Sequence, residues 1–414
     1  MDEYLRLPKG MHIRKADWLA HEAEILKLHA LYGKSIGCTP IKYAPLGFKS
    51  TFTREINTAN DKTYELEDRA GRQLVLSCDS TPSVLREYAF RAKFQPERIA
   101  FIAPLFRYRN DKAHNRHFTQ IGYSLINEKD PDEAVDFHII QLLVAMKKLT
   151  SKLGIKTEAH FNDFSAFRQT IAPYIGQETI NEFIHKFQFS DPGARIQMLK
   201  SAISDDDERR LACDLFESGV IEIDGGSGGI KLPKAYEKTL QMGKAMHEFL
   251  NEPVYFCPSD LHCIETICAY RVRLVNSKGK VSAEGGKYSN YANRFSGDIK
   301  SFWSVATGVE LLEREGAWNA YSERNQMVAL YNFGVTDAFL MKIIKAFQDT
   351  EYIISYQGNV NGVSVAVKSA HRKNYAYCLI LGQDEEVQNR FKMKRMSDNA
   401  TMEFIANDNC ILEC

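Results

Sequence analysis

The stretch IAFIAPLFRYRNDKAHNRHFTQIGYSLI, residues 99–126, consists of two apolar runs separated by a polar segment. The runs 99–109 and 116–126 are rich in Ile, Phe and Tyr, which is typical of β-strands, and residues 110–115 predict a loop between them. Arg107 lies near the end of the first run, where its planar guanidinium could hold a phosphate through two parallel hydrogen bonds. We therefore expect an antiparallel strand pair with a candidate anion-binding arginine at one end.

The composition of the chain sets its general class. With 414 residues it is longer than one ordinary domain, so two or three domains are expected. Lys and Arg number 53, as do Asp and Glu, and this balance leaves no overall field for a polyanion, although it is compatible with a local basic patch. No run approaches the roughly 18 apolar residues of a membrane helix, Met1–Tyr4 has no secretory profile, and nine cysteines are too few for a disulfide scaffold. We expect a soluble, cytoplasmic protein without membrane association.

Hydrophobic spacing predicts further elements. An amphipathic helix is expected from Val135 to Leu153, ending at Gly154, and the acidic run Asp205–Glu208 is expected to begin another helix, whose dipole it would complement. The segment Asp224–Gly229 lacks the spacing of a phosphate-binding loop and is interpreted as a plain loop. The other predictions are a helix over 18–31, a hairpin over 63–76, strands over 269–275 and 280–283, and an α/β block over 325–414.

The segment around Arg107 resembles motif 2 of the class II aminoacyl-tRNA synthetases, in which an arginine at a strand end contacts the α-phosphate of ATP. Other segments follow in the order that is typical of histidyl-tRNA synthetases. Asp79–Pro82 is also similar to the regulatory subunit of ATP phosphoribosyltransferase, a paralogue of these enzymes. The further matching segments are Glu67–Arg72, Leu74–Pro82, the expected turn Glu284–Tyr288, the motif 3 segment Thr307–Leu311 and the anticodon-domain segment Cys378–Glu386.

The resemblance implies an α+β fold with a class II synthetase-like core on an antiparallel sheet of six or seven strands. Residues 1–160 and 250–318 would form this core, residues 161–249 a helical insertion, and residues 325–414 a C-terminal α/β domain of the anticodon-binding type. Because the family dimerises through motif 1, a homodimer is expected, although Ala44 and Gly47 depart from that motif.

Other departures from the family pattern bear on function. Leu311 stands where motif 3 has an arginine for the γ-phosphate, and leucine cannot neutralise phosphate charge. Cys263–Cys268 replaces the histidine-specific string of the family, although Arg271 or Arg273 could occupy a nearby strand position. Ser124 stands where the family has an acid that holds the imidazole or amine of the substrate. A competent histidyl-tRNA synthetase is therefore not expected.

The resemblance also implies ligands and site residues. ATP with Mg²⁺ is the implied cofactor, whereas zinc is not expected, because Cys257, His262, Cys263 and Cys268 lack the Cys-x-x-Cys spacing of structural zinc sites. The implied nucleotide-binding residues are Arg107, Arg116 and His117, and the implied amino-acid-binding residues are Asp79, Thr81, Gln120, Gly285 and Gly286.

Several of these residues also have a structural interpretation that the sequence leaves open. Arg107 could pair with an acid such as Glu310 and only stabilise the sheet. Asp79 could cap the turn that follows it, and Arg116 could pair with an acid across the strands. His117, like His114 in the loop, could lie on a solvated surface.

The leading functional hypothesis is a non-aminoacylating paralogue of histidyl-tRNA synthetase that binds a ligand and a catalytic partner subunit. The regulatory subunit of ATP phosphoribosyltransferase, in histidine biosynthesis, is the example that the resemblance implies. The alternative is an ATP-dependent, adenylate-forming ligase or histidyl-like synthetase for another amino acid, so the sequence leaves open whether the chain is an enzyme. A third hypothesis is tRNA binding through the C-terminal domain, although Lys392, Lys394 and Arg395 are interpreted as a solvated edge strand.

Overall fold

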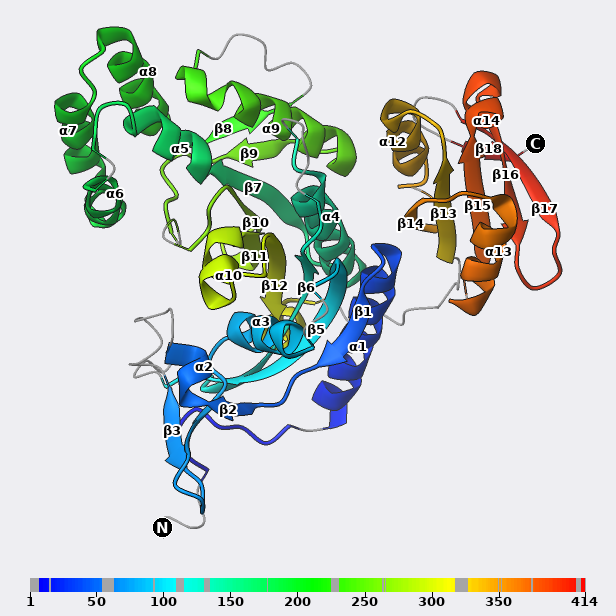
Figure 1. Ribbon diagram of the computed structural model, residues 1–414, viewed down its shortest axis with the longest axis horizontal. Coiled ribbons are helices and arrows are strands. Elements are labelled where there is room, and N and C mark those ends of the chain that lie inside the picture. Colours follow the sequence, from blue (N-terminus) through cyan, green and yellow to red (C-terminus); the bar gives the residue numbers. More distant parts are fainter. Residues whose placement is uncertain are drawn as a thin grey trace. The chain divides into compact units, whose positions relative to one another are not determined.

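The computed structural model describes residues 7–14, 16–53, 63–91, 94–108, 115–129, 135–176, 178–224, 231–262, 264, 266–316, 327–348, 350, 352–373, 375–406 and 411–413. The chain forms two compact units, Met1–His29 with Pro40–Ala317 and Ala30–Thr39 with Trp318–Cys414. Figure 1 shows the helices and strands of both units.

The first unit contains a large sheet, which in the described residues has nine strands in the order β1-β5-β6-β12-β11-β10-β7-β9-β8. The pairs from β5 to β7 are antiparallel, whereas β7 and β9 are parallel. The predicted antiparallel core is thus confirmed, and the additional strands make the sheet mixed. The strands are β1 (Thr39–Lys42), β5 (Glu97–Phe106), β6 (His117–Ile126), β7 (Thr157–Asp163), β8 (Ile221–Ile223), β9 (Val254–Phe256), β10 (Tyr270–Asn276), β11 (Val281–Lys287) and β12 (Phe302–Gly308).

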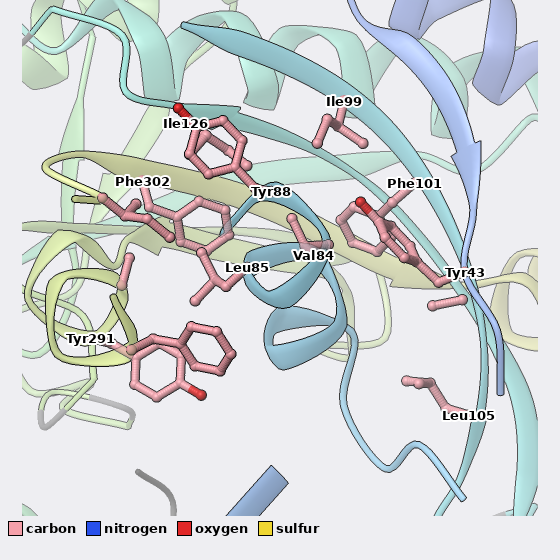
Figure 2. Close-up of a cluster of buried hydrophobic side chains, with 14 residues drawn as sticks. Tyr43, Val84, Leu85, Tyr88, Ile99, Phe101, Leu105, Ile126, Tyr291 and Phe302 are labelled. Atoms are coloured by element: carbon pink, nitrogen blue, oxygen red, sulfur yellow. The ribbon is translucent and has the colours of Figure 1, made fainter. Parts of the chain in front are cut away.

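Helices lie on both faces of this sheet, as the alternating residues of β12 show. The indole of Trp303 donates a 2.8 Å hydrogen bond to Asp136, the N-cap residue of α4 (Phe137–Lys152), so α4 lies on the Trp303 face. Phe302 points the other way and packs against α3 (Ser80–Phe90) and α10 (Ser289–Phe295). Figure 2 shows Leu85 and Tyr88 of α3 among the buried side chains of this second cluster.

Gly285 and Gly286 do not form the predicted turn, because β11 continues through them to Lys287. Their role is to let neighbouring strands approach. A Cβ atom on Gly285 would lie 2.0 Å from the carbonyl oxygen of Ser304, and one on Gly286 would lie 2.6 Å from that of Tyr270. The glycines therefore serve close packing within the sheet and not turn geometry.

The predicted hairpin over 63–76 is confirmed as the antiparallel pair β3 (Tyr64–Glu67) and β4 (Gln73–Leu76). With β2 (Leu46–Phe48) these strands form a small separate sheet, which α2 (Lys49–Thr53) contacts through the buried Phe52. The helix predicted over 18–31 is longer than expected and spans α1 (Ala16–Ser35).

Residues 164–250 consist mainly of helices, with the short strand β8 between the last two α-helices. Asp205 caps the helix that the acidic run was expected to begin, since its side chain accepts a hydrogen bond from the backbone N–H of Glu208. Most of the predicted loop Asp224–Gly229 lies outside the described residues. The helices are α5 (Phe164–Ile171), α6 (Ile180–Phe189), α7 (Pro192–Ala202), α8 (Asp206–Glu217) and α9 (Glu237–Leu250).

The second unit contains a sheet in the order β14-β13-β15-β16-β17-β18, with β13 parallel to both of its neighbours. The sequence predicted an edge strand around Lys392, and this prediction is wrong, because β16 pairs with both β15 and β17. The elements are β13 (Met327–Phe333), α12 (Asp337–Ala346), β14 (Ile353–Asn359), α13 (Val363–Arg372), β15 (Tyr377–Gly382), α14 (Gln383–Gln388), β16 (Arg390–Arg395), β17 (Thr401–Ala406) and β18 (Ile411–Glu413). Among the described residues of the chain, no helix is long and apolar enough to cross a membrane.

Limited proteolysis of the native protein is expected to cut within residues 318–325. The two units are divided between Ala317 and Trp318, and each has a hydrophobic core of its own, so both should stay folded after this cut, with residues 30–39 of the second unit remaining on the N-terminal fragment. Mass spectrometry of the early fragments provides the measurement. The proposed boundary at residue 325 would be contradicted if cleavage occurred only within 224–229 while residues 325–414 stayed attached and protected.

Candidate functional site

The strand register places several polar residues on one face of the large sheet, here called the site face and defined by Gln120, Gly122 and Ser124 of β6. The middle of this face carries small residues, while its β10 and β7 end carries charged and polar ones. Two rows run across the strands, the first with Gly122, Ala306, Glu284, Arg273 and His160, and the second with Ser124, Ser304, Gly286, Arg271 and Asn162.

Arg107, just beyond β5, is held by two acceptors and an aromatic ring. Its Nε donates a 2.6 Å hydrogen bond to the carbonyl oxygen of Cys78, and its Nη2 lies 3.2 Å from Oδ2 of Asp79. The guanidinium carbon lies 5.2 Å from the centre of the Phe118 ring, on the site face. Arg107 therefore pairs with an acid, as the structural alternative expected, but the acid is Asp79 and not the suggested Glu310.

Asp79 combines two contacts that the sequence offered as alternatives. Its Oδ1 accepts a 2.8 Å hydrogen bond from the backbone N–H of Thr81 and so caps α3, while its Oδ2 pairs with Arg107. The next residue, Ser80, donates from its hydroxyl to Oε1 of Gln120 at 2.7 Å. The structure thus brings together Arg107, Asp79, Thr81 and Gln120, four of the residues that the sequence predicted for one site.

Arg116, just before β6, and His117, its first residue, point to opposite faces of the sheet. The backbone N–H of Arg107 donates to the carbonyl oxygen of Arg116, so these two arginines face each other across the strand pair. The guanidinium of Arg116 lies 4.6 Å from the Tyr108 ring centre, and its Nη1 donates a 3.4 Å hydrogen bond to the hydroxyl of Tyr64. His117 instead stacks on Phe106 with ring centres 4.5 Å apart, and burial lowers its pKa. The structure therefore does not bring His117 to the site face, and His114 lies outside the described residues.

Glu310 holds the start of β6 through the backbone of Thr119. Both of its carboxylate oxygens accept from the backbone N–H of Thr119, at 3.1 and 3.0 Å, and Oε1 lies 3.0 Å from Nη2 of Arg14. Burial raises the pKa of this carboxyl group. Leu311 follows directly in α11 (Val309–Glu315), and a Cβ atom on Gly308 would lie 3.8 Å from its Cβ.

Arg271 and Arg273 form a charged cluster on the site face with two acids. Asp260 bridges the two arginines, with Oδ1 2.6 Å from Nη1 of Arg271 and Oδ2 2.5 Å from Nη2 of Arg273. Glu284 lies 2.9 Å from Nη2 of Arg271, whose side chain is only 4% exposed. The Arg-x-Arg spacing in a predicted strand indicated two arginines on one face. Nothing in the sequence indicated that Asp260 would pair with them, or that Arg14 would pair with Glu310.

Cys257 lies beside this cluster and has the properties of a buried thiol. Its Sγ is 3.3 Å from Nδ1 of His160, and burial raises its pKa to about 11 while it lowers the pKa of His160. A thiol that stays protonated at neutral pH is a poor nucleophile. Among the residues that the structure describes, no group of three or more His, Cys, Asp and Glu side chains could hold a metal ion, and Cys263 lies outside them.

Comparison with known proteins identifies the family. A profile described as "Histidyl-tRNA synthetase" matches residues 19–309. The chain belongs to the histidyl-tRNA synthetase family. This match includes all the strands that form the site face, and it ends one residue before Glu310.

Individual members of the histidyl-tRNA synthetase family are distant relatives of this chain. A histidine–tRNA ligase from Mesomycoplasma hyopneumoniae (strain 7448) is 28% identical over 169 residues, which are 40% of this chain and 38% of that protein. The matched part of this chain therefore corresponds to less than half of the length of this relative. A histidine–tRNA ligase from Clostridium botulinum (strain Hall) is 22% identical over 394 residues, 89% of this chain and 88% of that protein.

Solved structures show that the fold is shared with this family. An ATP phosphoribosyltransferase regulatory subunit/histidyl-tRNA synthetase from Bacillus halodurans C has a TM-score of 0.64 at 14% identity, covering 92% of this chain and 99% of that one. A histidyl-tRNA synthetase from Nostoc sp. PCC 7120 has a TM-score of 0.57 at 14% identity, covering 97% of both chains. At such low identity these likenesses establish the fold alone.

Proposed function

We propose that the chain is a member of the histidyl-tRNA synthetase family that does not charge tRNA and acts as a ligand-binding regulatory subunit, such as that of ATP phosphoribosyltransferase. The observation that carries this proposal is Leu311, which follows Glu310 at the position of the motif 3 arginine. A leucine there contributes no charge to a triphosphate, so the family's transition-state stabilisation would be incomplete.

The region that recognises histidine in the family also supports the proposal. Ser124, in place of an acid, is fully buried, and its hydroxyl lies 2.9 Å from the hydroxyl of Ser304. In the segment that replaces the histidine-specific string, Ile264 and Ile267 are buried, 0% and 1% exposed. Buried isoleucines offer no hydrogen bond to an imidazole, so the site face would bind its ligand through other groups.

A ligand with an anionic group fits the Arg107 end of the site face best. Arg107 is 25% exposed and is balanced by one carboxylate, Asp79, which is itself 37% exposed. A phosphate could therefore replace Asp79 as the partner of Arg107, with its charge-assisted hydrogen bonds in the same place. The family generally uses ATP with Mg²⁺. Asp79 already pairs with Arg107, and Glu310 already pairs with Arg14 and the backbone of Thr119. A magnesium ion would therefore take its ligands from the phosphates themselves.

One observation favours the enzymatic alternative, an ATP-dependent adenylate-forming ligase for an amino acid other than histidine. Arg14 places a guanidinium 3.0 Å from Glu310, next to the position where Leu311 removes one. An arginine supplied by the N-terminal segment could compensate for the missing charge of motif 3. In this alternative the unknown amino acid would lie between Gln120 and the Arg271–Arg273 cluster.

The regulatory proposal predicts a functional complex with a catalytic subunit. The purified chain is expected to bind a short-form phosphoribosyltransferase from the same organism and to raise its rate of phosphoribosyl-ATP formation. The measurements are co-elution in gel filtration and a rate assay with and without the chain, which is expected to form a homodimer as its family does. The absence of both complex formation and activation would contradict this proposal, whereas amino-acid-dependent pyrophosphate exchange by the chain alone would favour the ligase.

A further inference from the structure

The second unit contains an open cavity of about 720 Å³ that none of the functions above uses. It lies at the carboxyl ends of the parallel strands β13 and β14. The lining residues come from the two segments that follow these strands, namely Asn332, Phe333, Gly334, Val335 and Asp337 after β13, and Tyr356, Asn359, Val360 and Asn361 at the end of β14.

The topology of the unit explains why a cavity forms at this point. Val328 and Leu330 of β13 pack with Phe339 of α12, whereas the alternate residues Ala329 and Tyr331 pack with Ala366 of α13. The segment after β13 therefore leads to one face of the sheet and the segment after β14 to the other. Where neighbouring strands diverge in this way, α/β proteins commonly bind ligands at the carboxyl ends of the strands.

The side chain of Asn332 is used in hydrogen bonds within the loop after β13, so a ligand would be contacted by other side chains. Oδ1 of Asn332 accepts from the backbone N–H groups of Gly334 and Val335, at 2.9 and 3.0 Å, and Gly334 has a φ of +96°. Phe333 is 44% exposed at the rim, and the side chains of Asp337, Asn359 and Asn361 are exposed as well.

The charges around the cavity exclude a polyanion as its natural occupant. The segments 332–337, 356–362 and 382–389, which all lie at this edge of the sheet, contain Asp337, Asp384, Glu385 and Glu386 but no Lys, Arg or His. Lys373 reaches Gln357 at 2.7 Å and Lys342 reaches Asn389 at 3.3 Å, yet neither lysine lines the cavity. Nucleic acids need basic side chains to neutralise their phosphates, so this edge does not suit RNA.

We propose that this cavity binds a small organic cation of amino-acid size that carries a planar N–H donor group, such as a guanidinium or an imidazolium. Asp337 would accept the charged N–H groups, the amide oxygens of Asn359 and Asn361 would accept further hydrogen bonds, and the rings of Phe333 and Tyr356 would stack on the planar group. This site is separate from the Arg107 end of the site face and does not depend on the function proposed for it.

Helix capping offers a simpler explanation for the acid at the cavity, and it provides the control. Asp337 is in the first turn of α12, as Asp384 is in the first turn of α14, and a carboxylate at either place complements a helix dipole. Asp384 does not line the cavity. A purely structural role would therefore affect both positions alike.

Calorimetry at about pH 5.5, where the side chain of L-histidine is mostly protonated, tests the proposal on the full-length chain with L-arginine, L-histidine, inorganic phosphate and a ten-nucleotide single-stranded RNA. The native protein and the Asp384→Asn variant are expected to bind L-arginine or L-histidine equally well. Asp337→Asn should weaken this binding roughly tenfold or more, because a charge-assisted hydrogen bond is lost, and Phe333→Ala should weaken it less. All three changed residues are exposed, so the variants should fold, which their melting temperatures would verify.

Three results would overturn the proposal. The native chain could bind neither cation, the two aspartate variants could behave identically, or the RNA could bind more tightly to Asp337→Asn than to the native chain. The last result would identify this edge as a nucleic-acid surface whose acid opposes binding.

Discussion

Purified protein is expected to transfer no histidine to histidine tRNA at a rate typical of enzymes, which is about 1 per second or more. The loss of a single group that stabilises transition-state charge reduces turnover by about 100- to 1,000-fold, and Leu311 represents such a loss. The buried Ser124–Ser304 contact and the buried isoleucines add a second deficit, since they remove polar partners for the imidazole.

Leu311→Arg separates these two deficits. The substitution would return a guanidinium beside Glu310, but it would leave the histidine-recognition region unchanged, so charging with histidine is still expected to be absent. Measurement of histidine-dependent pyrophosphate exchange and of tRNA charging, for both proteins, checks this result. Charging by the native chain at about 1 per second would refute the expectation, and charging by the variant alone would show that Leu311 is the only deficit.

The central part of the fold could be predicted because its pattern is local. The alternation of apolar residues in 99–126 is enough to predict two strands, and the polar segment between them predicts that they are antiparallel neighbours. The structure supplies the register, with Phe106 opposite His117 and Ala103 opposite Gln120. The parallel pairing of β9 with β7 could not be predicted in the same way, since the two strands are separated by most of the helical insertion.

The site was harder to predict because ion pairs join residues that are distant in the sequence. Glu310 was a reasonable acid for Arg107, yet α11 directs it to the backbone of Thr119, and Asp79 reaches Arg107 from the start of α3. His117 shows a different reason. Its neighbours in the sequence suggested a site residue, but the period of two along a strand places it on the face opposite to Gln120.

Arg107→Ala is expected to weaken ATP binding roughly 10- to 150-fold, which corresponds to the loss of a charge-assisted hydrogen bond worth about 1.5–3 kcal/mol. The reason is the position of the guanidinium, which lies beyond the end of β5 and is fixed by Cys78 and by the Phe118 ring. Isothermal titration calorimetry with ATP on the native chain and on the variant provides the measurement. Arg314→Ala is a suitable control, because the side chain of Arg314 is 61% exposed and its Nη2 lies 3.9 Å from the carboxylate of Glu315.

Asp79→Asn decides between a ligand-binding and a structural role for Arg107. Asparagine caps a helix about as well as aspartate, so α3 should keep its cap while the negative charge beside Arg107 disappears. If Arg107 holds a phosphate, ATP should bind at least as tightly to Asp79→Asn as to the native chain, because no carboxylate then competes for the guanidinium. If Arg107 only stabilises the fold through Asp79, the native chain should bind no ATP and both substitutions should lower the melting temperature. That second outcome would remove the nucleotide from the site face, and the ligase alternative would be lost with it, since adenylate formation requires ATP at this position.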